Sequence, residues 1–271
     1  MPASIMHGVK LSVSVVEYFS APDILVETLR RLESAVFFAK TSAILYVINN
    51  RPNQSLSLPD LQSDVFMELR VKSGQGNVGF GRGHNIAISE VVSEYHLILN
   101  PDAFLEVDAI EKAIAFLDEH PDVGLVVPDA LAPNGNRQYL CKRYPTLLDL
   151  MLRGFAPAVL HRLFRKRLNR YEMQDVVGSD VLLDPPIVSG CCMLFRTDVL
   201  KKLNGFDPRY FLYFEDFDLS LRTARVTHIA YLPSMKIIHY GGYAARKGWR
   251  HVYLFMRSAM TFFRTYGWKF W

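Results

Sequence analysis

Short apolar runs alternate with amphipathic segments along the first 130 residues of the chain. The runs are rich in Val, Ile and Leu, which is typical of buried strands, and the segments between them repeat apolar residues at helical spacing. The pattern predicts strands at 10–16, 43–48, 65–71, 95–99 and 123–127, and helices at 22–38, 84–92 and 107–119. This order favours an open, mostly parallel, twisted α/β sheet flanked by helices, in which ligands bind beyond the carboxyl ends of the strands.

The second half of the chain has a less regular pattern. It predicts helices at 146–170, 197–203 and 217–225, and strands at 187–195, 228–232 and 236–239. No linker separates the two halves. We therefore expect one compact domain over residues 1–245, with halves at about 1–130 and 131–245, followed by a helical, basic C-terminal extension at 246–271.

Composition narrows the class of protein. Of the 271 residues, 50% are hydrophobic and 21% are charged, which supports a sizeable core and argues against a disordered chain. The longest stretch without a charged residue, 185–195, is too short to cross a membrane. The first ten residues lack the basic stretch followed by an apolar stretch that is typical of a signal peptide. Because the cysteines (Cys141, Cys191 and Cys192) are odd in number and two are adjacent, we expect reduced thiols in a cytosolic protein.

Positive charge is concentrated at the C-terminus. Residues 219–271 contain nine Lys and Arg and no acidic residue, a second basic cluster lies at 153–170, and the last 23 residues contain nine aromatic side chains. Aromatic rings mixed with basic residues suit an anionic membrane surface. The alternative is a helix that packs on the domain and exposes a basic face. Nucleic acid is a poorer partner, because no nucleic-acid-binding motif accompanies the charge.

Two candidate ligand-binding segments follow predicted strands. Asp102 comes directly after the strand at 95–99, where a carboxylate could bind Mg²⁺ or Mn²⁺, or could cap the next turn. The loop 73–83 carries five glycines and leads into a helix bearing Asn85. Such a loop lets backbone N–H groups approach a phosphate or a sugar, and the alternative is a flexible turn. It matches neither the P-loop nor the dinucleotide fingerprint.

An acidic cluster in the second half could supply a general base. Glu215 and Asp216 lie among aromatic residues, and burial beside aromatic rings raises a carboxyl pKa towards the range useful for proton abstraction. The alternative role of this cluster is to stabilise the start of a helix. Asp218 and Arg222, four residues apart, are expected to form an ion pair. His239 could bind a metal only if it lies near Asp102, and it is otherwise structural.

Several segments stand in a characteristic order. They are 16–19 (Val-Glu-Tyr-Phe), 47–50 (Val-Ile-Asn-Asn), 77–81 (Asn-Val-Gly-Phe-Gly) with Asn85, 99–102 (Leu-Asn-Pro-Asp), 189–190 (Ser-Gly), 205–207 (Gly-Phe-Asp), 213–219 (Tyr-Phe-Glu-Asp-Phe-Asp-Leu) with Arg222, and His239. In this order they resemble glycosyltransferase family two, in particular its rhamnosyltransferase-like branch with the GT-A fold. The resemblance covers about residues 9–242. Glu17, Phe19, Asn49 and Asn100 depart from it, since the family usually has Thr, Asn, Asp and Asp at these positions.

The resemblance implies a role for each matching residue. Residues expected around the donor are Tyr18, Asn49 and Asn50 at the base and ribose, and Asn77, Gly79, Asn85 and Asn100 at the diphosphate and sugar. Asp102 would hold Mg²⁺ or Mn²⁺ on the diphosphate, with His239 as a second ligand. Ser189 and Gly190 would lie on the acceptor side. Asp216 would be the base, with Glu215 beside it, and we expect Asp102 and Asp216 to face each other across one cleft.

The implied activity is inverting transfer of a sugar, with L-rhamnose as the expected sugar, in the synthesis of a cell-surface polysaccharide such as O-antigen. The donor would be a dTDP- or UDP-sugar. The acceptor would be a saccharide or a lipid-linked saccharide, which places a peripheral protein at the cytoplasmic face of the membrane. Two alternatives remain at this point: a sugar nucleotidyltransferase, and a non-catalytic saccharide-binding protein, which the altered Glu17, Asn49 and Asn100 would suit.

Overall fold

A large mixed sheet forms the centre of the molecule. The computed structural model describes residues 8–52, 56, 58–62, 64–241 and 248–271; the expectations for residues 1–7 and for the boundary at 245–246 therefore lie outside the described residues. In this part of the chain the sheet has ten strands. The main path runs, in spatial order, through β3 (Phe66–Lys72), β2 (Ala43–Asn49), β1 (Leu11–Glu17), β4 (Tyr95–Leu99), β11 (Cys192–Arg196), β6 (Val123–Leu131), β12 (His228–His239) and β5 (Ala103–Leu105).

Most strands of this path point the same way, as the sequence predicts. β3, β2, β1 and β4 pair in parallel, and so do β6 and β12. β11 is antiparallel to both β4 and β6, and β5 is antiparallel to β12. Because β1, β2 and β4 are parallel neighbours, the residues that follow them meet at one edge of the sheet.

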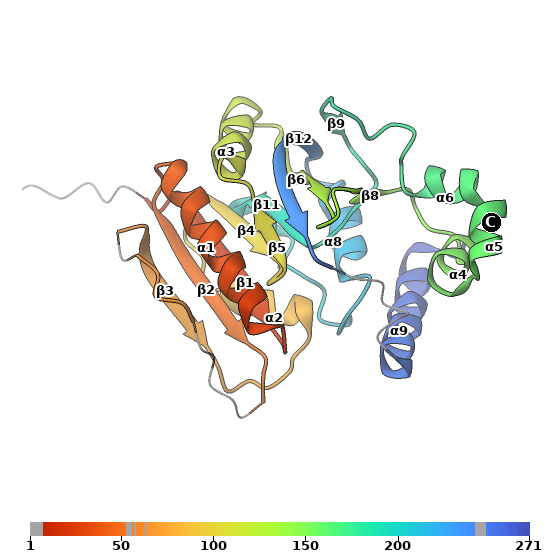
Figure 1. Cartoon of the computed structure of the whole chain (residues 1–271), viewed down its shortest axis with the longest axis horizontal. Helices are drawn as coiled ribbons and strands as arrows, with labels where there is room; N and C mark the ends of the chain where they lie inside the picture. Colours follow the sequence, from red (N-terminus) through yellow and green to blue (C-terminus); the bar gives the residue numbers. More distant parts are fainter. Residues whose placement is uncertain (1–7, 53–55, 57, 63, 242–247) are drawn as a thin grey trace, which may run out of the picture.

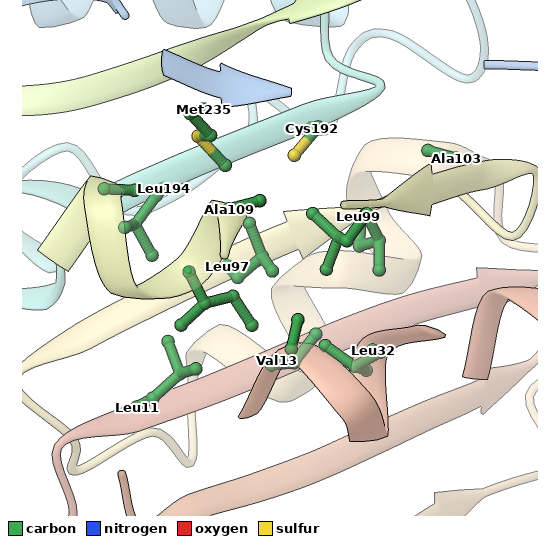
Figure 2. Packing of buried hydrophobic residues seen from close by; sticks show 14 of the residues in the cluster. Leu11, Val13, Leu32, Leu97, Leu99, Ala103, Ala109, Cys192, Leu194 and Met235 are labelled. Carbon is green, nitrogen blue, oxygen red and sulfur yellow. The ribbon is translucent and has the colours of Figure 1, made fainter. Parts of the chain in front are cut away.

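Helices cover both faces of the sheet. α1 (Pro22–Phe38) and α3 (Ala109–Glu119) lie in front in Figure 1 and bury a row of apolar residues against the strands. Figure 2 shows Leu11 and Val13 of β1 packing with Leu97 and Leu99 of β4 and with Leu32 of α1. The other face packs against α2 (Phe80–Ile88), α7 (Thr197–Lys202) and α8 (Glu215–Thr223).

A group of helices gathers at the end of the molecule opposite β3 (Figure 1). It comprises α4 (Leu147–Phe155), α5 (Ala158–Leu163), α6 (Arg165–Tyr171) and α9 (Trp249–Tyr266). Thr146 and Asp149 form a capping box at the start of α4, and the backbone N–H of Leu147 donates to the carbonyl of Lys269 (2.9 Å). The chain end therefore ties α9 to α4. No helix among the described residues is long and apolar enough to cross a membrane.

Four short strands complete the second half: β7 (Arg137–Gln138) beside β6, β9 (Leu182–Leu183) beside β12, and β8 (Cys141–Lys142), which forms a separate pair with β10 (Ile187–Val188). Cys141, Cys191 and Cys192 are buried and form no disulfide.

Several predicted boundaries are wrong in this half. The helix predicted at 146–170 is three helices: α4 ends before Pro157, which cannot continue it, and a second break at Phe164 separates α5 from α6. The strand predicted at 187–195 is divided between β10 and β11, and those at 228–232 and 236–239 form the single strand β12.

Candidate active site

Asn100 and Asp102 lie in the turn between β4 and β5. The backbone N–H of Asn100 donates to the carbonyl of Cys191 (2.8 Å), and the carbonyl of Asp102 accepts from the N–H of Tyr240 (2.9 Å). These bonds attach the turn to two segments more than 90 residues later in the sequence. The Asp102 side chain is 30% exposed, so a ligand can reach it.

His239 lies beside Asp102, as is required of a histidine that could bind a metal there. The antiparallel pairing of β12 with β5 places His239 opposite Ala103, and its Nε2 lies 3.5 Å from Asp102 Oδ1. Gln138 holds the ring by a hydrogen bond between its Oε1 and His239 Nδ1 (2.9 Å), and its Nε2 donates to the backbone carbonyl of His239 (2.8 Å). Nε2 is buried and has no hydrogen-bond partner among the described residues.

This pair fits a divalent cation. A metal-binding histidine commonly has its second ring nitrogen held by an amide or a carboxylate, as Gln138 does here. Mg²⁺ and Mn²⁺ sites often use one or two protein ligands together with substrate phosphates. No group of three or more His, Cys, Asp and Glu side chains suited to a metal occurs among the described residues, so the remaining ligands would come from a bound diphosphate and water.

Glu215 and Asp216 form the first turn of α8. Asp216 accepts hydrogen bonds from the backbone N–H groups of Gly190 and Phe217, both at 3.0 Å. Burial raises the pKa of both carboxyl groups, and the charge of Asp216 adds to the rise at Glu215, whose pKa lies well above its ordinary value. Two N–H groups stabilise the charged form of Asp216 and so oppose the rise in its pKa.

The turn between β10 and β11 joins these two groups of residues. Gly190 donates to Asp216, and the next residue, Cys191, accepts from Asn100. The charges of both Asp102 and Asp216 act on the Cys191 thiol, although burial is the main reason that its pKa rises to about 12. The structure therefore places both Asp102 and Asp216 near the turn between β10 and β11. Ser189 lies in the same turn, where its N–H donates to the Leu140 carbonyl (3.0 Å).

The residues expected around the donor lie at the ends of β1 and β2 and in the glycine-rich loop. Asn49 and Asn50 are each 1% exposed. The amide of Asn50 donates to the Gly79 carbonyl (3.0 Å), which ties β2 to the loop, and Asn77 Oδ1 accepts from the Gly79 N–H (3.0 Å). Tyr18 follows β1 and is 43% exposed.

Gly79 and Asn85 have structural roles that the sequence did not reveal. Gly79 has a φ of +91°, and a Cβ at this position would lie 2.2 Å from the carbonyl oxygen of Phe211. α2 starts at Phe80, so the loop ends at Gly79 and is shorter than the predicted range 73–83. The amide of Asn85 forms two hydrogen bonds with the backbone of Phe206 (2.7 and 2.9 Å) and joins α2 to the segment before α8.

Sequence reasoning missed two neighbours of the donor residues. Arg51 follows Asn50 and forms an ion pair with Glu17 (2.6 Å), whose side chain is fully buried. Gln75 donates to the Asn49 carbonyl (2.8 Å). The position of Arg51, three residues after the strand predicted at 43–48, was the available signal. The ion pair gives the unusual Glu17 a structural role.

The sheet order, the helices on both faces and the carboxylate of Asp102 after β4 define a GT-A type glycosyltransferase fold. Solved structures support this assignment of the fold. The chain is similar to S. aureus TarS (residues 1–349; TM-score 0.53, 17% identity, 85% of this chain and 60% of that chain). It is also similar to GalNAc-T7 with UDP, GalNAc and Mn²⁺ (TM-score 0.59, 12% identity, 85% of this chain and 43% of that chain).

The chain belongs to glycosyltransferase-like family 2, whose family model matches residues 11–270. Among curated relatives, it is 24% identical over 198 residues to the N-acetylglucosaminyl-diphospho-decaprenol L-rhamnosyltransferase of Mycobacterium tuberculosis, covering 67% of this chain. It is 28% identical over 178 residues to rhamnosyltransferase WbbL of Escherichia coli, covering 61% of this chain. The matches span 62% of the length of each relative.

Proposed function

We propose that this protein is an inverting glycosyltransferase that moves a sugar from a nucleoside-diphosphate donor to a hydroxyl group of a saccharide. One observation carries the proposal: Asp216 and Asn100 form hydrogen bonds with the adjacent residues Gly190 and Cys191. A carboxylate suited to proton abstraction and the Asp102–His239 pair therefore lie near one turn. Membership of the family supports the same reaction.

Asp216 is the general base in this proposal. Its carboxylate takes the proton of the acceptor hydroxyl while that oxygen forms a bond to the anomeric carbon of the donor sugar. The bond from this carbon to the diphosphate breaks on the opposite face, which inverts the configuration. A positioned base of this kind contributes roughly 10²–10⁴-fold to the rate. Glu215, in its neutral form, limits the negative charge beside the base.

Asp102 and His239 would hold Mg²⁺ or Mn²⁺ at the diphosphate. When bound, such a cation stabilises the charge that develops on the leaving diphosphate. Tyr18 and Asn77 contact the nucleotide and sugar, while the buried Asn49, Asn50 and Gly79 position the end of β2 and the glycine-rich loop around them. Asn85 supports the loop from α2, and Ser189 and Gly190 border the acceptor.

We infer L-rhamnose as the transferred sugar and a lipid-linked saccharide as the acceptor. The names of both relatives support the sugar, and that of the Mycobacterium tuberculosis relative supports the acceptor. An acceptor of this class would place the protein at the inner face of a membrane, as a peripheral protein. The reaction would belong to the synthesis of a cell-surface polysaccharide such as O-antigen.

The test uses purified protein in two assays. Thermal unfolding is followed with dTDP or UDP, with and without Mn²⁺, because a ligand that binds the folded state raises the melting temperature. Transfer is then measured from dTDP-L-rhamnose to an N-acetylglucosaminyl-diphospho-lipid, and the anomeric configuration of the product is determined. We expect one nucleotide to raise the melting temperature more with Mn²⁺, and a product of inverted configuration. A retained configuration, or no binding of any nucleoside diphosphate, would contradict the proposal.

A further inference from the structure

One face of α9 holds the segment that precedes the candidate base. Ser258 Oγ donates to the carbonyl of Leu212 (2.8 Å), and the Tyr213 hydroxyl shares a hydrogen bond with His251 Nδ1 (2.8 Å). The Tyr266 hydroxyl donates to Oδ1 of Asp218 (2.7 Å). α9 therefore contacts the chain on both sides of Glu215 and Asp216.

The held segment has an unfavourable backbone conformation. Tyr213 and Phe214 have φ values of 70° and 66°, so two consecutive residues with side chains occupy the left-handed region. Such residues persist only where surrounding contacts hold them. The ring of Phe214 supplies these contacts, since its centroid lies 5.1 Å from that of Phe255 and 5.3 Å from that of Phe262, both on α9. Contacts from α9 therefore stabilise the strained residues that directly precede Glu215 and Asp216.

The opposite face of α9 is apolar and exposed. Trp249, Tyr253, Met256 and Met260 recur at intervals of four, three and four residues, which places them on one side of the helix. They are 82%, 60%, 54% and 39% exposed. An exposed row of large apolar side chains marks an interaction surface.

The charge beside this row selects an anionic lipid bilayer as the partner. Arg250, Arg257 and Arg264 are exposed and recur every seven residues, so they form a basic stripe along the same helix. No acidic residue occurs between 219 and 271. Trp and Tyr beside Arg are typical of a helix that lies in the membrane interface, with its aromatic rings among the lipid headgroups.

We propose that α9 binds an anionic bilayer with one face and holds the segment 212–216 with the other, so that membrane binding accelerates transfer at Asp216. The proposal rests on the function proposed above and adds a regulation of the same site. A bilayer that binds the docked helix increases the fraction of molecules in which the segment is correctly placed, and the rate rises with that fraction.

The test compares transfer rates with a water-soluble acceptor, so that delivery of a lipid acceptor cannot contribute. Vesicles contain phosphatidylglycerol and phosphatidylcholine, or phosphatidylcholine alone. We expect the protein to float with the anionic vesicles only and its rate to rise about threefold or more. The double variant Trp249→Ser/Tyr253→Ser should give the same rate with and without vesicles. The matched control Phe37→Ser/Met67→Ser changes two exposed apolar residues on α1 and β3 and should respond to vesicles as the wild type does.

Two further measurements separate this proposal from the proposed function. Ser258→Ala should float normally but transfer more slowly, because it loses the bond to Leu212. Hydrogen exchange of the 212–216 amides should slow when anionic vesicles are added, a readout that needs no activity. Absence of flotation, or flotation with unchanged exchange, would overturn the coupling whether or not the protein transfers a sugar. Absent transfer with slowed exchange would instead contradict the proposed function alone.

Discussion

The two halves of the molecule position their functional residues in different ways. In the half that ends near residue 130, the candidate donor residues follow adjacent parallel strands, so the order of β1, β2 and β4 brings them together. In the other half, Asp216 is held by Gly190, which is 26 residues away in the sequence. The segment before it is held by α9, which lies still further along the chain.

We infer from this difference that the first half mainly binds the donor and the second half mainly positions the base. Strand ends in a parallel sheet are fixed by the backbone ladder, which suits a site that binds the same part of every donor. The base depends on side-chain contacts between segments far apart in the sequence, so its position can change without loss of the sheet. We therefore expect substitutions in the second half to affect the rate of transfer and those in the first half to affect donor binding or stability.

The largest expected effect is that of Asp216→Asn. Asparagine keeps the shape of the side chain and can still accept from Gly190, but it cannot take a proton, so transfer should fall roughly 10²–10⁴-fold. The thermal shift caused by the nucleoside diphosphate and Mn²⁺ should stay unchanged. Asp180→Asn, at an exposed position, is the control and should keep full activity. Unchanged turnover in Asp216→Asn would exclude Asp216 as the base.

A large loss of stability is expected from Gly79→Ala in the first half. The new methyl group would meet the Phe211 carbonyl at 2.2 Å, and a φ of +91° is strained for alanine. We expect the free energy of unfolding to fall by about 3 kcal/mol or more.

Gly74→Ala provides the matched control for this change, since its φ is +93° but nothing lies within 4 Å of the added Cβ. It should lose only about 1 kcal/mol. Urea denaturation of both variants gives the comparison. Equal losses would show that the close approach of Phe211 has no energetic weight.

The sequence predicts the first half well because its signals are local. α1 begins at Pro22 and ends at Phe38, as predicted, and β4 matches its predicted range. The turn after β4 is also local, so the sequence alone is enough to select Asp102 as a candidate ligand. It is not enough to select Gln138, which fixes His239, because that contact spans 101 residues.

The second half was harder to predict because its elements are stabilised by distant contacts. The break between β10 and β11 places Gly190 against Asp216, which no local pattern indicates. For the C-terminal segment the sequence favours a membrane surface, with packing on the domain as the alternative. In the structure α9 has a buried face with Phe262 and Phe263 and an exposed face with Trp249. The helix therefore packs on the domain, and its exposed face keeps the aromatic and basic side chains that suit a membrane surface.

An intermediate effect is expected from Asp102→Asn, which tests the donor half. Losing the carboxylate should lower transfer about 10–100-fold, and Mn²⁺ should no longer add to the thermal shift caused by the nucleotide. That second result distinguishes it from Asp216→Asn. Asp60→Asn, at an exposed position, serves as the control. A variant that still responds fully to Mn²⁺ would remove Asp102 as a metal ligand.

The smallest expected effect is on the pH dependence of stability. Buried histidines in the first half and buried carboxyl groups in the second half have pKa values shifted in opposite directions from their ordinary values. Behind β1, Ser14 Oγ forms hydrogen bonds with His96 Nε2 (2.8 Å) and His84 Nδ1 (2.7 Å). Burial lowers the pKa of both histidines, that of His96 to about 3. Their contribution to stability is therefore complete above the unfolded pKa of about 6.5 and is lost as the pH falls below it.

The carboxyl pair of the second half has the opposite dependence. Because the pKa values of Glu215 and Asp216 are raised in the folded protein, their contribution is complete below the unfolded values near 4 and is lost as the pH rises through the folded ones. Between pH 5 and 6.5 the two halves therefore oppose each other, and each histidine contributes a slope of up to about 1.4 kcal/mol per pH unit. Urea midpoints measured across this range should rise less steeply with pH in His96→Gln and more steeply in Glu215→Gln than in the wild type. Identical slopes in all three proteins would mean that neither buried group titrates differently in the folded and unfolded states.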